Sequence, residues 1–212
     1  MRYYPVFLDI AGKPVVVMGG GNIAHQKVVG LLKAGAEVTV ISPELNPEMA
    51  ALSAEGRFRH IVRDYEPGDI EGYVLAFVAT DDRSVNATVA AEGKERRVWV
   101  NAVDDPPYCD FIMPGIAQQG DLIVAISTSG RSPAMARKMR EELEEFLTQD
   151  YALMLDLAAE VRAELREKDV LVDAEIWNKA LDGGLKQLLA GGKRAEARER
   201  LMRSLSDPVG TP

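Results

Sequence analysis

A run of three consecutive glycines, Gly19–Gly21, constrains the fold of this chain more than any other feature of its sequence. The apolar stretch 15–18 comes directly before the run, and a helical pattern with Val28 and Leu31 on one face follows it. A simple turn between a strand and a helix needs only one residue that can adopt positive φ. The run therefore predicts a tight strand-turn-helix unit in which the backbone comes close to another group.

Strands and helices alternate along the first half of the sequence. Another helix is expected to begin with Asn46 as its cap and Pro47 at the first helical position, and to end at Gly56. Parallel strands need crossover connections, so alternation of this kind predicts a doubly wound parallel sheet of the Rossmann type over residues 1–110. Its buried strands are expected at 15–18, 37–41, 58–62, 73–79 and 98–102.

The pattern changes after residue 104. The run Asp105-Pro106-Pro107 can continue neither a strand nor a helix. Two strands, 111–113 and 122–128, are expected to form a hairpin around the turn-like residues 118–121. We therefore expect an α/β chain whose sheet is followed by a small hairpin.

A long helix should follow this hairpin, with Ser132 as its cap and an end near Leu147. The hairpin and this helix together make a second region, residues 111–148. The remainder, 149–212, is expected to be an all-α segment with breaks at 169–173 and at 191–192.

Composition excludes several classes of protein. The 212 residues carry a net charge of −8, so no overall positive field can collect nucleic acid or an anionic membrane surface. No apolar stretch reaches the roughly 20 residues that span a bilayer. The single cysteine, Cys109, cannot form an internal disulfide, and the N-terminus lacks the pattern of a secretion signal. These features favour the cytoplasm.

The glycine run fits the pattern G-x-G-x-x-G/A, with Gly19, Gly21 and Ala24 at the three small positions. In dinucleotide-binding units, the first glycine makes the turn, the second lets the backbone approach a pyrophosphate, and the third small residue lets the helix pack on the strand. The helix start at Asn22 and Ile23 offers free N–H groups to an anion. The sequence thus predicts a nicotinamide dinucleotide site, and a plain turn is the weaker alternative.

The acidic residue that usually ends the second strand and holds the 2′-OH of NAD is missing. Ser42 stands in its place, followed by Pro43 and Glu44, and no Arg or Lys occurs from residue 42 to residue 49 to pair with a 2′-phosphate. NAD is therefore favoured over NADP, although an ordinary turn at Ser42 explains these residues equally well. Thr80 and Asp81 end the fourth strand at the same edge and are expected to cap a helix, contact the cofactor, or both.

Several short sequence motifs that occur in one order along the chain are more specific than the glycine run. They are Gly19-Gly20-Gly21 with Ala24 and Lys27, residues 38–43, Ala79-Thr80-Asp81-Asp82 with Asn86, Asn101-Ala102-Val103-Asp104, Phe111-Ile112-Met113-Pro114, and residues 125–133. In these motifs, about the first 150 residues resemble the precorrin-2 dehydrogenase family, which includes the N-terminal module of siroheme synthases. The methyltransferase module of the fused siroheme synthases does not follow here, so the resemblance implies the stand-alone form.

The resemblance implies that the chain oxidises precorrin-2 to sirohydrochlorin with NAD, and that it is a homodimer interlocked through the region after the sheet. Some family members also insert ferrous iron to give siroheme, and the sequence leaves this second activity open. The apolar face of the long helix could form the dimer contact or could be core of a single chain. That face consists of Met135, Met139, Leu143 and Phe146.

Asp104 matches the catalytic aspartate of the family. Oxidation of a reduced tetrapyrrole needs hydride transfer and loss of a proton, and metal insertion needs loss of pyrrole protons, so one carboxylate could serve either step. The alternative is a turn residue before the proline pair, with Asp105 as the competing carboxylate.

The loop 127–132 resembles the family's loop near the tetrapyrrole. Its hydroxyl and N–H groups suit substrate carboxylates, and its arginine could neutralise others. Thr128 stands where family members often have serine, and it keeps the hydroxyl. Plain capping of the next helix by Ser132 is compatible with this role. The candidate substrate-binding residues are Ser127, Thr128, Ser129, Gly130 and Arg131.

No metal-ligand spacing is present, because the two histidines, His25 and His60, lie on different elements beside a single cysteine. A nucleotide-sensing regulatory domain without catalysis is the main rival to an enzyme, and a dehydrogenase of another substrate is a second rival. A sensor needs neither a carboxylate at the crevice nor a second loop facing it. Residues 104–133 therefore favour an enzyme.

Overall fold

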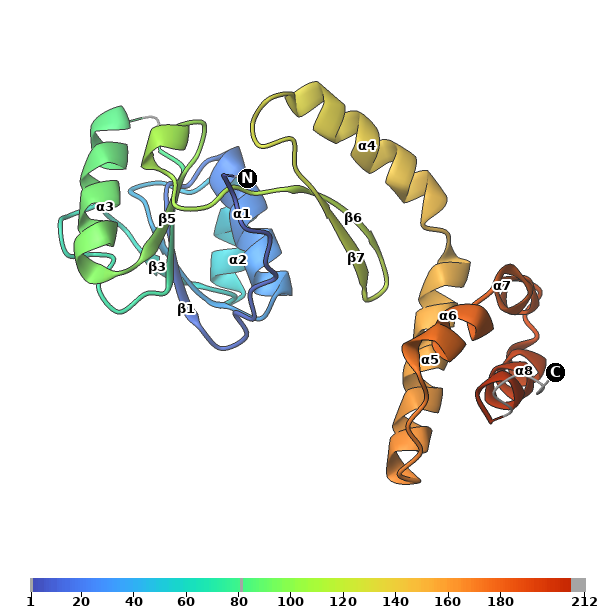
Figure 1. Cartoon of the computed structure of the whole chain (residues 1–212). Coiled ribbons are helices and arrows are strands. Elements are labelled where there is room, and N and C mark those ends of the chain that lie inside the picture. Colours follow the sequence, from blue (N-terminus) through green and yellow to red (C-terminus); the bar gives the residue numbers. More distant parts are fainter. Residues whose placement is uncertain (1, 81, 207–212) are drawn as a thin grey trace. The chain divides into compact units, whose positions relative to one another are not determined.

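The computed structural model describes residues 2–80 and 82–206, which divide into two compact units with the boundary between Met113 and Pro114 (Figure 1). The first unit contains a sheet of five parallel strands in the order β3-β2-β1-β4-β5. The predicted doubly wound parallel sheet is confirmed. Its strands are β1 (Pro14–Met18), β2 (Glu37–Ile41), β3 (Arg59–Ile61), β4 (Leu75–Val78) and β5 (Trp99–Ala102).

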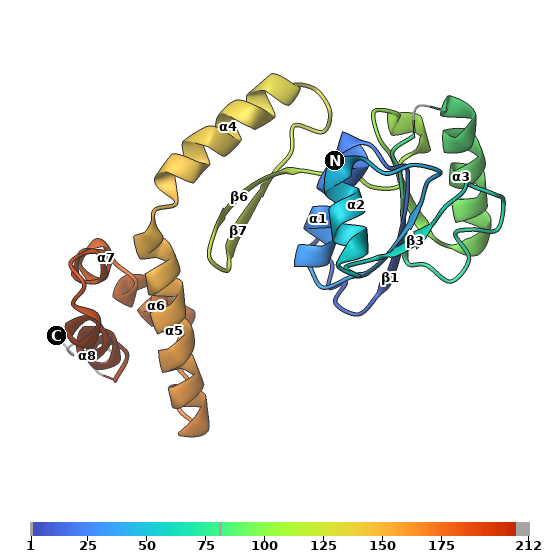
Figure 2. The same cartoon turned by 180° about the vertical axis from the view of Figure 1, so that it is seen from behind.

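Helices cover both faces of this sheet (Figures 1 and 2). Side chains of β1 alternate between the faces, so that Val15 and Val17 pack in one core cluster and Val16 and Met18 in the other. α1 (Asn22–Lys33) and α2 (Pro47–Ala54) cover the first face, and α3 (Arg83–Arg96) covers the second. Each fully buried aliphatic side chain contributes about 1.5–3 kcal/mol to such a core. The strand order changes direction between β1 and β4, where parallel sheets bind ligands.

The second unit begins with an antiparallel hairpin of β6 (Gly115–Gln119) and β7 (Leu122–Ile126). A hairpin was predicted here, but its first strand was wrongly placed at 111–113. Those residues belong to the first unit, where the Phe111 ring packs edge-on against Phe77 at 5.5 Å between centroids. The carbonyl oxygen of Phe111 accepts from Asn101 Nδ2 at 2.8 Å, and Pro114 has no N–H to donate to a ladder.

Helices make up the rest of the second unit. Ser132 Oγ accepts from the backbone N–H of Met135 at 3.2 Å, so it caps the helix that follows, as predicted. The helical segment breaks at the predicted places and also at Asp182, which caps the next helix through the N–H of Leu185. The helices are α4 (Pro133–Phe146), α5 (Gln149–Glu167), α6 (Ala174–Ala180), α7 (Gly183–Ala190) and α8 (Arg194–Ser206).

The last four helices share one apolar core. Leu157 and Val161 of α5 are fully buried against Leu185 of α7 and Leu201 of α8. None of the described helices combines the length and apolar character needed to cross a membrane.

Candidate functional site

The glycine turn after β1 packs directly against the ends of two neighbouring strands. Gly19 has φ +117°, and a Cβ there would collide with the carbonyl of Ala79 at the end of β4. A Cβ at Gly20 would collide with the carbonyl oxygen of Glu44, and the carbonyl of Gly20 accepts from the N–H of Asn46 at 2.8 Å. The packing of the protein itself therefore explains why Gly19 and Gly20 lack side chains.

Gly21 differs from the other two glycines of the turn. Its φ is −84°, and a Cβ built on it would meet no atom of the described residues within 4 Å. It is the N-cap of α1, and no side chain caps this helix, whereas Asn46 caps α2 and Asp82 caps α3. No described side chain therefore caps the N–H groups of Asn22 and Ile23 at the start of α1, and uncapped N–H groups at a helix start are the arrangement that binds a pyrophosphate. These residues fit the dinucleotide that the motif predicts.

A cleft of about 300 Å³ lies beside this turn at the carboxyl edge of the sheet. Its floor is apolar, with Met18, Ile41 and Val85, and its rim carries hydroxyl and carboxylate groups. Gly19, Ser42, Pro43 and Thr80 were predicted to contact a cofactor, and all four line the cleft together with Asp64, Tyr65 and Asp82.

Ser42 holds the end of β2 through its own hydrogen bonds. Its Oγ donates to the carbonyl of Glu44 at 2.6 Å, and its carbonyl accepts from His60 Nε2 at 2.9 Å. The Ser42 hydroxyl can therefore still accept a hydrogen bond from a ribose hydroxyl, but its proton is already used. His60, which had no role from sequence, positions this strand end.

The helix cap after β4 is Asp82, not Thr80, since Asp82 Oδ1 accepts from the N–H of Ser84 at 2.9 Å. Hydrogen bonds from the Ser84 hydroxyl and backbone lower the pKa of Asp82. Thr80 instead donates to the carbonyl of Asp82 at 3.4 Å. Asp81, the other predicted residue here, lies outside the described residues.

Tyr65 and Asp64 come from the loop that joins β3 to β4, and sequence reasoning missed both. The Tyr65 hydroxyl donates to Glu92 Oε2 at 2.5 Å, and the other oxygen of Glu92 accepts from the Gly68 N–H at 3.0 Å and from Arg96 Nε at 2.9 Å. Burial raises the pKa of Tyr65, and the Glu92 carboxylate raises it further. The buried Glu92 thereby fixes one wall of the cleft from 27 positions away in sequence.

Asp104 stands on a tight turn just beyond β5, at the same edge of the sheet. Its φ is +57°, a left-handed conformation that aspartate and asparagine adopt more readily than most residues. The N–H of Asp105 donates to the carbonyl of Ala102 at 3.2 Å and closes the turn. The Asp104 side chain is exposed, and its carboxylate makes no hydrogen bond or ion pair with the described residues.

Asp105, the competing carboxylate, is engaged within the protein. Its Oδ2 accepts from Asn86 Nδ2 at 3.2 Å, and Asn86 is only 4% exposed. The Oδ1 atom of Asn86 has no hydrogen-bond partner among the described residues. Of the two neighbouring carboxylates, Asp104 is the one without a hydrogen bond or ion pair to a described side chain.

Cys109 and Asn101 hold the chain as it returns from this turn. The Cys109 thiol donates to the carbonyl of Ala102 at 3.0 Å, and burial raises the pKa of this thiol, which keeps it a donor. Asn101 binds the carbonyl of Phe111, so its side chain serves the fold of the turn.

The loop 127–132 lies in the second unit and is internally bonded. Thr128 Oγ1 donates to the carbonyl of Ser132 at 3.1 Å, and Ser127 Oγ accepts from the N–H of Ser129 at 3.0 Å. Ser129 and Gly130 both have positive φ, at 55° and 79°. Arg131 is exposed and makes no ion pair with the described residues. The structure brings these five candidate residues together in one turn.

The described residues contain no group of three or more His, Cys, Asp and Glu side chains placed to hold a metal ion.

Comparison with known proteins now bears on this site. A family model described as "Putative NAD(P)-binding" matches residues 6–115, which include the whole sheet and the glycine turn. The chain belongs to this NAD(P)-binding family. A second model, described as "Sirohaem biosynthesis protein central", matches residues 119–145 in the second unit.

Relatives of this NAD(P)-binding protein are siroheme synthases. The chain is 38% identical over 208 residues to the siroheme synthase of Methylobacillus flagellatus, covering 97% of this chain and 44% of that protein. It is 38% identical over 204 residues to the siroheme synthase of Photobacterium profundum, covering 95% of this chain and 44% of that protein. The chain thus spans less than half the length of these relatives.

A solved structure with the same fold is that of the precorrin-2 dehydrogenase SirC. It matches with a TM-score of 0.78 and 26% sequence identity, covering 95% of this chain and all of the SirC chain. The resemblance to the precorrin-2 dehydrogenase and siroheme synthase family is therefore confirmed.

Proposed function

We propose that this chain is an NAD-dependent precorrin-2 dehydrogenase that forms sirohydrochlorin in siroheme biosynthesis. The observation that carries the proposal is a free carboxylate, Asp104, at the same sheet edge as the uncapped helix start at Gly21. A domain that only senses a nucleotide needs no unengaged carboxylate there. The match with SirC over its full length supports the same substrate.

The reaction removes two hydrogen atoms from precorrin-2, one as a hydride and one as a proton. Bound NAD supplies the hydride acceptor, and Asp104 takes the proton. Its carboxylate can do so because it makes no hydrogen bond or ion pair with a described side chain. The loop residues Ser127–Arg131 hold acid side chains of the tetrapyrrole in this proposal, with Arg131 as the cation.

The proposal is tested by supplying the full chain with precorrin-2 and NAD and following NADH absorbance together with the tetrapyrrole spectrum. One NADH per sirohydrochlorin is expected. If the wild-type chain forms no NADH, the dehydrogenase proposal is wrong and the nucleotide-sensing domain remains as the alternative. Ferrous iron added afterwards tests the chelatase step, in which iron is a substrate, and the appearance of the siroheme spectrum would establish it. The reaction is proposed to run in the cytoplasm.

NAD is preferred over NADP because the cleft has an acidic rim. Asp64 and Asp82 line it, and no lysine or arginine is among its described lining residues. A 2′-phosphate brought to this rim would meet carboxylates and find no cation to pair with. In this proposal Asp64, from the loop after the neighbouring strand β3, takes the place of the acid absent from the end of β2.

Replacing Asp64 with lysine should lower the ratio of kcat/KM for NAD to kcat/KM for NADP by a factor of about 10. The reason is that a charge that repels the 2′-phosphate becomes one that attracts it. The ratio of kcat/KM for the two cofactors measures this change. Glu66→Lys is the matched control, because Glu66 is exposed on the same loop and does not line the cleft. An equal change in both variants would show that general charge, not the cleft rim, sets the preference.

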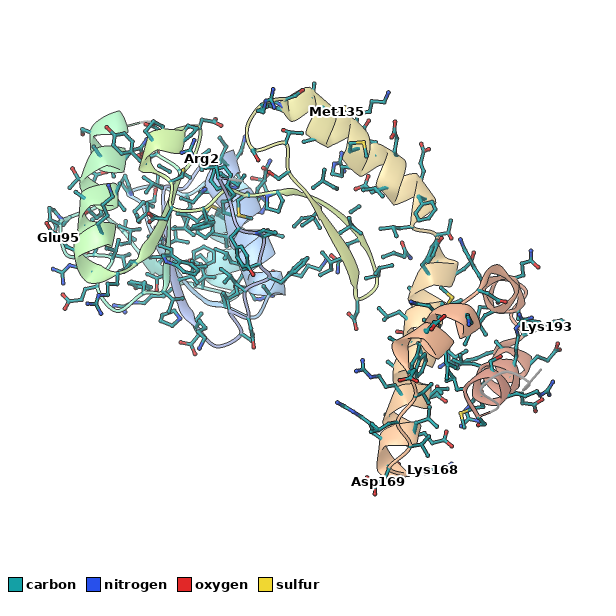
Figure 3. All side chains as sticks on the ribbon, in the orientation of Figure 1. Arg2, Glu95, Met135, Lys168, Asp169 and Lys193 are labelled. Carbon is teal, nitrogen blue, oxygen red and sulfur yellow. The ribbon has the colours of Figure 1, made fainter. Side chains whose placement is uncertain are left out.

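We also propose that two copies of the chain associate through the hairpin and α4. No side chain of α4 is fully buried, and its apolar residues Met135 and Phe146 are 49% and 58% exposed. Figure 3 shows Met135 near the start of this helix. The outward face of the hairpin carries Ile116 and Ile123, which are 45% and 40% exposed. A two-stranded sheet is only marginally stable alone, and an apolar patch of this kind is typical of an interface.

Sedimentation equilibrium is expected to give twice the mass of one chain, and Met135→Glu should raise the dimer dissociation constant at least about 10-fold. Glutamate three residues after the Ser132 cap favours the helix itself, so a loss of association cannot come from unfolding of α4. Lys138→Glu, an exposed charge reversal on the same helix, should leave the mass unchanged. A wild-type monomer at high concentration would contradict the proposal.

A further inference from the structure

Lys27 occupies a position on α1 where an apolar residue would be expected. Three residues before it Ala24 is fully buried, and four residues after it Leu31 is buried, so Lys27 lies on the core-facing side of the helix. Its side chain is half-buried, whereas Lys33 in the last turn of the same helix is exposed.

The Lys27 ammonium makes no direct contact with a charged group among the described residues. Within the described part of the chain it makes no hydrogen bond or ion pair, and Asp104 is the one carboxylate whose charge acts on it. Burial lowers the pKa of Lys27, and the charge of Asp104 raises it in part. A cation withdrawn from water without a direct partner lowers the stability of the folded state.

A lysine can avoid this cost by laying its alkyl chain over apolar surface and leaving its ammonium group in water. Lys27 does this only in part, since its side chain stays half-buried. A partly desolvated cation and an unengaged carboxylate close together are typical of a binding site, in which an anionic group of the ligand pairs with the cation.

We propose that Lys27 is a substrate-binding residue whose ammonium pairs with an acid side chain of the tetrapyrrole and holds it next to Asp104. The inference rests on the proposed function, since it takes the tetrapyrrole as substrate and Asp104 as its base. Charge-assisted pairing of this kind is stronger in a partly dry site than in water.

The cofactor pyrophosphate is the other anion that Lys27 could meet, and the placement of the groups favours the substrate. A bound pyrophosphate would have its own partners in the N–H groups at the start of α1, where no described side chain caps the helix. Lys27 does not line the cofactor cleft, which lies among the ends of β1, β2 and β4. Asp104, the group that acts on Lys27, follows β5, on the other side of β4 from β1.

The test compares Lys27→Met, Lys27→Arg and the control Lys33→Met in the full chain. Lys27→Met is expected to raise the KM for precorrin-2 and the dissociation constant of sirohydrochlorin at least about 10-fold, with the KM for NAD unchanged. Lys27→Arg should restore most of the affinity because it keeps the charge. Lys33→Met should match the wild type in all three constants.

Thermal unfolding separates a binding role from a structural one. Methionine removes an uncompensated charge from a half-buried position, so Lys27→Met should unfold at the same temperature as the wild type or higher. A lower unfolding temperature, unchanged sirohydrochlorin binding, or a rise confined to the KM for NAD would each overturn the inference. Sirohydrochlorin binding is measured without turnover, so a wild type that binds it but forms no NADH contradicts the dehydrogenase proposal alone.

Discussion

Replacing Asp104 with asparagine is expected to lower kcat for NADH formation by a factor of about 10² to 10⁴, the usual contribution of a general base. Asparagine adopts the left-handed conformation of this turn as readily as aspartate, so the backbone at φ +57° should persist. The amide keeps the size of the side chain but does not accept a proton at neutral pH. NAD affinity and the unfolding temperature should therefore stay at their wild-type values.

Asp105→Asn is the matched control for this variant. Asp105 neighbours the turn residue and carries the same charge, but its carboxylate is held by Asn86. An asparagine there can keep a hydrogen bond to Asn86, so turnover should remain within a factor of about 3 of the wild type. Undiminished turnover in Asp104→Asn, or an equal loss in Asp105→Asn, would remove Asp104 from the role of base.

The parallel sheet was predictable because its signals are local. Short β-branched runs such as those of β1 and β2 are separated by helical patterns with readable caps, and Asn46 and Ser132 cap the helices that their sequence context indicates. Parallel strands can be connected only through crossovers, so the alternation alone implied the layered arrangement. The three-part division of the chain at 110 and 148 stays a prediction.

The first strand of the hairpin was misplaced because an apolar run is compatible with a strand or with core packing. Residues 111–113 form an apolar run that is typical of a strand. Only the contacts of Phe111 with Phe77 and Asn101 place them in the first unit. Both contacts join residues at least ten positions apart, which local patterning cannot reveal.

The residues that line the cleft were likewise predicted where the sequence signal is local and missed where the relevant contacts are distant in sequence. Gly19, Ser42 and Thr80 were predicted from the strand ends on which they lie. Asp64 and Tyr65 follow an edge strand of three residues, and the carboxylate that positions Tyr65 is on α3. No spacing rule connects that loop to that helix. The hydroxyl of Ser42 was correctly placed at the edge, but its bond to Glu44 could be seen only in three dimensions.

Gly20→Ala is expected to destabilise the fold, whereas Gly21→Ala is expected to weaken NAD binding in a stable protein. A methyl group at Gly20 would collide with the backbone carbonyl of Glu44, which cannot move without disturbing the bond between Asn46 and Gly20. Thermal unfolding should show a loss of about 3 kcal/mol or more in the first unit. NAD affinity should fall with it, because the turn itself is displaced.

Gly21→Ala should fold almost normally, since its methyl group meets nothing within 4 Å and its φ of −84° suits alanine. Alanine is a poorer N-cap than glycine, so the loss in unfolding free energy should stay below about 1 kcal/mol. The methyl group would nevertheless stand where a pyrophosphate approaches the uncapped start of α1. Isothermal titration should therefore show NAD binding weakened at least about 10-fold in a stable protein. Wild-type NAD affinity in Gly21→Ala would show that the anion binds elsewhere, because open space next to free N–H groups is what distinguishes this glycine from its two neighbours.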